Sequence, residues 1–112
     1  MIEKIVRDYL VNNTTVPVVM EVPKTPPAEM YIIEKTGGDE DEGIFHSTIV
    51  VQSYAETLYR AAELSDAVRS MMVYGLIGEA DIVSVELNSE YNFTDTATKK
   101  YRYQAVFDIV HY

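Results

Sequence analysis

Apolar side chains in the first ten residues recur at the spacing of an α-helix. The stripe consists of Ile2, Ile5, Val6, Tyr9 and Leu10. Side chains at these intervals lie on one face of a helix, which can then pack against a core. Polar residues at 12–14 end the pattern, so the sequence predicts a short N-terminal helix that stops there.

A second, longer helical pattern begins after Ser53. Ser53 and Glu56 have the spacing of a capping box, in which two side chains satisfy free N–H groups at a helix start. The apolar face of this helix carries Tyr54, Leu58, Ala61, Ala62, Ser65, Val68 and Met72, and the opposite face carries Glu56, Arg60, Glu63, Asp66 and Ser70. Leu64 and Met71 lie at the margin of the apolar stripe. We expect the stripe to pack in the core, and we regard its margin as a candidate interface. Glycines at 75 and 78 end the helix.

Five segments are predicted to be strands, from alternation or from β-branched content: residues 16–22, 30–35, 44–52, 82–87 and 101–112. Pro17 fits best near the start of the first strand or on a sheet edge, because proline cannot donate to a ladder. The turn-rich stretches 23–27 and 37–43 are predicted to be loops.

The last strand alternates strictly. Tyr101, Tyr103, Ala105, Phe107 and Ile109 share one face, and Arg102, Gln104, Val106, Asp108 and Val110 share the other. At ~3.4 Å per residue this strand is about 40 Å long, whereas a compact domain of this size is about 35 Å across. We therefore expect the final hairpin either to overhang the core or to bend strongly. An overhang favours pairing with a partner chain.

These segments predict a single α+β domain over residues 1–112, with the order α-β-β-β-α-β-β. Short connections between neighbouring strands favour a mostly antiparallel, twisted sheet. Two amphipathic helices can then pack on one face of that sheet.

Charge and composition narrow the possible partners. The chain has eighteen acidic and nine basic residues, for a net charge of −9. Such a chain is repelled by nucleic acid and by anionic lipid, so we expect no direct nucleic-acid recognition and no membrane binding. We do not expect the N-terminus to be a signal peptide, because charges interrupt its apolar pairs. Nine tyrosines favour surfaces that are half apolar and half wet, which include protein interfaces.

The sequence contains no recognisable catalytic, cofactor or metal site, so we expect no enzymatic activity. It has no cysteine, and its two histidines, His46 and His111, are far apart in the chain. A metal site would need further well-placed ligands. The glycine patterns that cradle phosphates or hold a nucleophilic serine are missing.

Two charged clusters are nevertheless candidate interface positions. Asp39, Glu40, Asp41 and Glu42 are four consecutive acids. Their register does not fit a calcium-binding EF-hand loop, and we expect a mobile, solvated loop that can become ordered against a neighbour. Lys99, Lys100 and Arg102 alternate with Tyr101 and Tyr103 near the start of the last strand. This cluster favours a solvated strand end or an ion-paired contact with an acidic neighbour.

The order of these segments resembles the tail terminator, or tail completion, proteins of long-tailed phages, including the minor tail protein U family. The resemblance covers nearly the whole chain and rests on four stretches: the N-terminal helix leading into 16–18, the strand and double glycine at 31–38, the strand and helix at 48–64, and the closing hairpin at 91–105. No single motif in them is diagnostic.

The resemblance implies a structural virion protein. Such proteins form a ring, usually of six copies, at the head-proximal end of the tail tube. The ring stops tube polymerisation and offers a surface for head–tail joining. The implied partners are further copies of the chain, the tail tube protein and a head-completion or neck protein. The implied location is the virion tail, after assembly in the host bacterial cytoplasm.

Two alternatives remain at this point. Another head–tail connector or neck protein would also form rings without an active site. A small acidic regulatory module that binds proteins, such as a nucleic-acid mimic, would spread its carboxylates over one face. Here four of the eighteen acids are consecutive, and the others are scattered along the chain.

Overall fold

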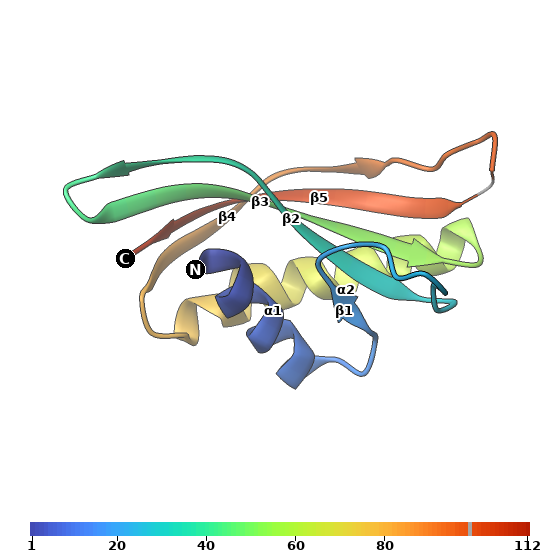
Figure 1. Ribbon diagram of the computed structural model, residues 1–112, viewed down its shortest axis with the longest axis horizontal. Coiled ribbons are helices and arrows are strands. Elements are labelled where there is room, and N and C mark those ends of the chain that lie inside the picture. Colours follow the sequence, from blue (N-terminus) through green and yellow to red (C-terminus); the bar gives the residue numbers. More distant parts are fainter. Residues whose placement is uncertain (99) are drawn as a thin grey trace.

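The protein folds as a five-stranded mixed sheet with two α-helices on one face (Figure 1). The structure is a computed structural model that describes residues 1–98 and 100–112. In chain order the elements are α1 (Ile2–Asn13), β1 (Val18–Val19), β2 (Met30–Asp41), β3 (Ile44–Ala55), α2 (Leu58–Gly75), the 3₁₀ helix η1 (Leu76–Gly78), β4 (Ile82–Asn92) and β5 (Tyr101–His111). The α+β class is confirmed, and the predicted order is matched roughly, with η1 added and β1 shortened to two residues.

The strands lie in the order β1-β2-β3-β5-β4. Neighbours among the four long strands are antiparallel, but β1 runs parallel to β2, with Val18 opposite Tyr31. The sheet is therefore mixed and not purely antiparallel. The segment 20–29 carries the chain back past β1 before β2 begins, and this return makes the first pair parallel.

The core lies between the helices and one face of the sheet. Val6 and Leu10 of α1, Val68 of α2 and Phe107 of β5 have no exposed surface. The predicted stripe of α1 and the predicted inward face of β5 are confirmed, since Ile2, Ala105 and Ile109 are also buried. Successive side chains of a strand point to opposite faces of the sheet, so a strict alternation of apolar and polar residues identifies the buried face.

The second helix starts later than the capping box predicts. Its N-cap is Thr57, whose hydroxyl accepts a hydrogen bond from the backbone N–H of Arg60 at 3.1 Å. Ser53 is instead a buried residue of β3, because β3 pairs with β2 as far as Tyr54 and with β5 as far as Ala55. The extended ladder prevails over the local cap, and the prediction of a helix from Ser53 was wrong.

The predicted loop at 37–43 is also wrong, except at its tip. β2 continues to Asp41, and its outer half pairs with β3 from Ile44 onwards. Only Glu42 and Gly43 form the turn, with φ angles of 51° and 84°. Positive φ at both central residues is the requirement of a type I′ hairpin turn.

The molecule is elongated, measuring 44 × 25 × 25 Å. Figure 1 shows the β2–β3 hairpin projecting beyond the helices at one end, while the β4–β5 connection lies at the other end near the start of α2. For the last hairpin the sequence left two outcomes, an overhang or a strong bend; in the structure β5 is a central strand paired with β3 on one side and β4 on the other. The overhanging element is the β2–β3 hairpin.

Candidate functional site

Two of the predicted interface residues belong to the interior. Leu64 is 3% exposed and packs in the core, so its assignment to an interface was wrong. Met71 is half-buried against the same core, and its carbonyl accepts a hydrogen bond from the hydroxyl of Tyr9 at 2.9 Å. The buried stripe of α2 is wider than predicted because Tyr9 of α1 contacts the helix at Met71 and Tyr31 of β2 contacts it at Leu64.

Tyr101 and Tyr103 are also turned mainly inward. Both are partly buried and pack against the core from the inward face of β5. Arg102, between them, points to the face of the sheet that the helices leave uncovered. Of this predicted cluster, Arg102 and Lys100 line a pocket, and Lys99 lies outside the described residues.

This pocket lies at the end of the sheet where three connections meet, which we call the pocket end: the segment 20–29, the β3–α2 turn and the β4–β5 connection. Its volume is about 700 Å³, within the range of roughly 300–1,000 Å³ typical of binding pockets. The lining consists of Val22, Pro26, Pro27, Ala28, Met30, Tyr54, Ala55, Glu56, Asp95, Lys100 and Arg102.

Arg102 is held in place by two aromatic rings and two acceptors. Its Nε donates to the carbonyl oxygen of Phe93 at 2.7 Å, and its guanidinium lies 4.5 Å from the centre of the Phe93 ring. On the other side it donates to the hydroxyl of Tyr54, its partner across the β3–β5 ladder, and lies 5.5 Å from that ring centre. Both contacts fix a charged group at the pocket wall with little remaining freedom.

A row of polar side chains continues from Tyr54 across the uncovered face. The hydroxyl of Tyr54 donates to Gln52 at 3.3 Å, Gln52 donates to Gln104 at 2.9 Å, and Gln104 donates to the hydroxyl of Tyr91 at 2.6 Å. The residues come from β3, β5 and β4, so the row joins three strands. Side chains in such a chain of hydrogen bonds hold one another in a single arrangement.

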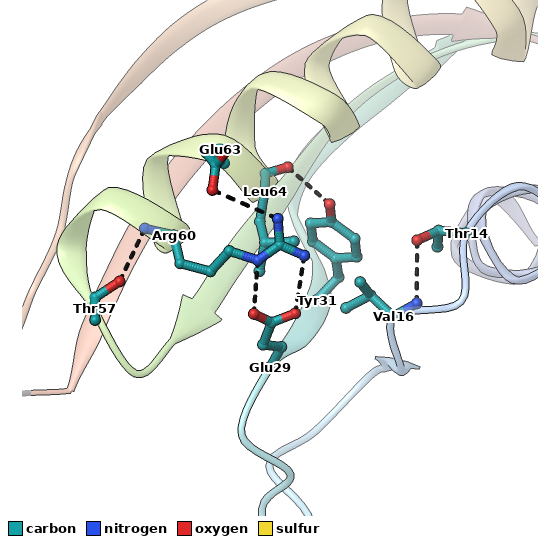
Figure 2. Close-up of polar contacts among 8 residues, drawn as sticks. All are labelled: Thr14, Val16, Glu29, Tyr31, Thr57, Arg60, Glu63 and Leu64. Atoms are coloured by element: carbon teal, nitrogen blue, oxygen red, sulfur yellow. Dashed lines mark hydrogen bonds and ion pairs between the residues drawn. The ribbon is translucent and has the colours of Figure 1, made fainter.

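The segment 20–29 is fastened to α2 by an ion pair. Figure 2 shows the guanidinium of Arg60 facing the carboxylate of Glu29, with bonds of 2.7 and 3.1 Å. Arg60 holds the pKa of Glu29 below its usual range, and Glu29 raises that of Arg60. A bidentate pair fixes orientation as well as distance, so the prolines at 26 and 27 are held over the pocket.

Behind this pair, a buried tyrosine ties the sheet to the helix (Figure 2). The hydroxyl of Tyr31 donates to the carbonyl oxygen of Leu64 at 2.8 Å. Burial raises the pKa of Tyr31 to about 12. The helix therefore keeps one position relative to β2, and the Arg60 pair keeps its geometry.

The four consecutive acids lie at the opposite end of the sheet. We call Asp39, Glu40, Asp41 and Glu42 the acidic tip; all four side chains are exposed on the β2–β3 hairpin. Asp39 contacts His46 across the ladder, with 2.9 Å between its Oδ1 and Nδ1 of the imidazole. Successive side chains of a strand point to opposite faces, so the acids are not gathered on one side.

The two histidines lie in different settings. His46 is exposed beside Asp39, whereas His111 is buried, with its Nε2 2.8 Å from the hydroxyl oxygen of Ser47 and its ring stacked on Phe45 at 5.3 Å. Within residues 1–98 and 100–112 no group of three or more histidine, cysteine or acidic side chains is placed to hold a metal ion.

Sequence reasoning missed Tyr54 as part of this site because it placed that residue on the helix. Only the register of β3 with β5 brings Tyr54 beside Arg102.

Among the described residues, no helix is long and apolar enough to cross a membrane. A comparison of the chain with profiles of known protein families and with curated protein sequences found no match.

Proposed function

We propose that this chain is a structural protein of a phage or prophage virion, which forms a ring at the head-proximal end of the tail tube. The ring stops tube polymerisation and provides the surface for head–tail joining. The proposal starts from the resemblance to tail terminator proteins carried by the order of the strands and helices.

One observation supports it most: the two ends of the elongated molecule are different. One end carries the projecting β2–β3 hairpin with its acidic tip, and the other carries the pocket beside Arg102. A closed ring requires two different surfaces on every copy, because each copy contacts one neighbour with one surface and the next neighbour with the other. A molecule with two unlike ends meets this requirement.

The test uses purified tail tubes that lack their terminator. Added protein is expected to bind one end of each tube, to prevent further addition of tube subunits, and to appear in electron micrographs as a ring. Binding to filled heads instead of tubes would favour the neck protein. If the protein binds neither structure at concentrations at which it forms rings, the proposed function fails.

A further inference from the structure

We infer that the pocket beside Arg102 receives the acidic tip of a second copy of this chain. The inference rests on the proposed ring and names the surfaces that meet in it. In this arrangement the β2–β3 hairpin of one copy inserts between the segment 20–29 and the β4–β5 connection of its neighbour.

The two surfaces cannot meet within one molecule. Met30, at the start of β2, lines the pocket, whereas the acidic tip lies at the far end of the same strand. At ~3.3 Å per residue the two are about 35 Å apart. The contact is therefore made only between copies, head to tail, and such a contact repeats from copy to copy and forms a ring where the rotation between copies closes.

The pocket end carries most of the basic side chains that are free to pair with an acidic occupant. Within the described part of the chain, Lys24, Lys35, Lys100 and Arg102 are the basic residues outside any ion pair. Lys100 and Arg102 line the pocket, and Lys24 belongs to the segment that covers it. The rest of the molecule is strongly acidic, so this is the end at which an acidic tip is least repelled.

Two carboxylates also line the pocket and must be counted. Asp95 accepts hydrogen bonds from Thr98 and from the backbone N–H of Ala97, which hold its pKa below the usual range and keep it charged. Glu56 is exposed. These two acids offset Lys100 and Arg102, so the lining has no net charge, whereas the whole chain carries −9. The walls are otherwise apolar or aromatic, with Pro26, Pro27 and Tyr54 among them. Such walls lower the local dielectric constant and strengthen ion pairs with Arg102.

The acidic tip has the form of a docking element. It is a paired hairpin closed by a two-residue turn, so inserting it requires little ordering of the backbone. A pocket of about 700 Å³ has room for the end of a hairpin, and the free basic side chains beside it can pair with the carboxylates of the tip.

Replacing the four acids of the tip distinguishes a specific contact between tip and pocket from general charge repulsion between copies. A tip variant with Asp39→Asn, Glu40→Gln, Asp41→Asn and Glu42→Gln loses four negative charges. The control variant, with Glu3→Gln, Glu34→Gln, Glu79→Gln and Glu86→Gln, loses the same number elsewhere. If repulsion alone governed assembly, both variants would form more rings than the unmodified chain. We expect the control to do so, and we expect the tip variant to form at least tenfold fewer.

A mixing experiment then tests the pairing directly. Lys100→Glu on an exposed loop, alone and with Arg102→Gln, disables the pocket; circular dichroism melts check that each variant is folded. The tip variant and the pocket variant are each expected to be monomeric in sedimentation velocity. Mixed in equal amounts, they retain one working contact, so we expect dimers of twice the 12.7 kDa chain and nothing larger.

The outcomes distinguish this inference from the proposed function. If the tip or pocket variants form rings as well as the control, or if the mixture contains only monomers, the inference is wrong; in the first case the proposed ring stands. If the dimers form as expected but the rings do not cap tail tubes, the inference stands and the proposed function is wrong.

Discussion

At the scale of single residues, Gly75 at the end of α2 determines how closely the two helices approach. Tyr9 of α1 lies over this glycine while donating to the carbonyl oxygen of Met71. A Cβ atom added at position 75 would collide with the Tyr9 hydroxyl and lie 3.0 Å from its Cζ. The glycine is thus needed for space and not for an unusual backbone angle, since its φ is −114°.

We therefore predict that Gly75→Ala destabilises the protein although alanine is the better helix former. The ring of Tyr9 must move, and overpacking of this kind costs about 1–3 kcal/mol. Urea denaturation measures the loss in the free energy of unfolding. Tyr9→Ala removes the obstacle, so Gly75→Ala should cost little in that background. An equal loss in both backgrounds would contradict the explanation.

The buried hydroxyl of Tyr31 predicts a dependence of stability on alkaline pH. Its pKa is raised from 10.0 to about 12 in the folded protein, chiefly by burial. The folded state thus holds its proton more tightly than the unfolded chain. This contribution is complete below pH 10, and it is lost as the pH rises from 10 through about 12.

We therefore predict that the Tyr31→Phe variant has a lower free energy of unfolding than the unmodified protein at neutral pH. This difference should disappear in alkali. At pH 7 the lost hydrogen bond to Leu64 should cost roughly 0.5–1.5 kcal/mol. The difference should shrink as the pH rises above 10, because phenylalanine has no proton to lose. Denaturation at several pH values measures this convergence, and Tyr59→Phe, at a side chain that is 76% exposed, is the control. A difference that stays constant up to pH 12 would contradict the assignment.

At the scale of elements, the turn of the β2–β3 hairpin contains a residue that suits it poorly. Glu42 has a φ of 51°, a left-handed conformation that asparagine and glycine adopt more readily than glutamate. Asn-Gly is the favoured pair for this turn type. We predict that Glu42→Asn raises the free energy of unfolding by about 0.5–1 kcal/mol.

Thermal and urea unfolding of Glu42→Asn test this, with Glu40→Gln as the control for loss of one charge at the same tip. Glu40 lies in the paired strand opposite Phe45, so its replacement changes charge without changing the turn. Equal stabilisation by both substitutions would show that relief of charge repulsion, and not the backbone angle, is responsible.

The same hairpin explains where sequence reasoning succeeded and where it failed. The two faces of β5 were predictable because successive side chains of a strand point to opposite sides of the sheet, and the apolar ones lie on the buried side. The double glycine at 37–38 was misread as a loop because glycine usually ends strands. Here a Cβ on Gly38 would lie 2.7 Å from the carbonyl oxygen of His46 in the paired strand. Glycine permits that close approach, which only the register reveals.

The candidate site was predicted in part for a similar reason. Arg102 was recognised from its neighbours in sequence, and Lys100 with it. Tyr54, Phe93 and the prolines at 26 and 27 come from other segments, and strand pairing alone brings them to Arg102. Leu64 was misassigned because a helix pattern alone does not show where a strand packs; here the hydroxyl of Tyr31 in β2 donates to the carbonyl oxygen of Leu64.

At the scale of the whole molecule, the net charge predicts how assembly depends on salt. Six copies at −9 each would carry −54, and this repulsion acts over long distances through solvent. Salt screens it beyond a Debye length of about 8 Å at physiological ionic strength, while partly buried ion pairs such as those proposed at the pocket are screened less.

We therefore predict a larger ring fraction at high salt than at low salt. Sedimentation velocity or light scattering over a range of protein concentrations at both salt levels measures it. The acidic-tip variant should show a weaker response, because it lacks both the contact and part of the repulsion. Rings that dissociate as salt is raised would show that attraction between exposed charges, and not long-range repulsion, dominates assembly.

The central position of β5 has a consequence for how the chain acquires its structure. Each of its neighbours can form a hairpin with an adjacent segment, but β3 and β5 are joined across α2 and β4. The sheet therefore remains in two halves, β1–β2–β3 and the β4–β5 hairpin, until β5 pairs with β3. Pairing of segments so far apart in sequence is intrinsically slow. During that interval the edge of β3 is unpaired, and unpaired strand edges make newly made chains prone to aggregate. Chaperone demand and yield in the cell should thus be governed by the rate of this one closure.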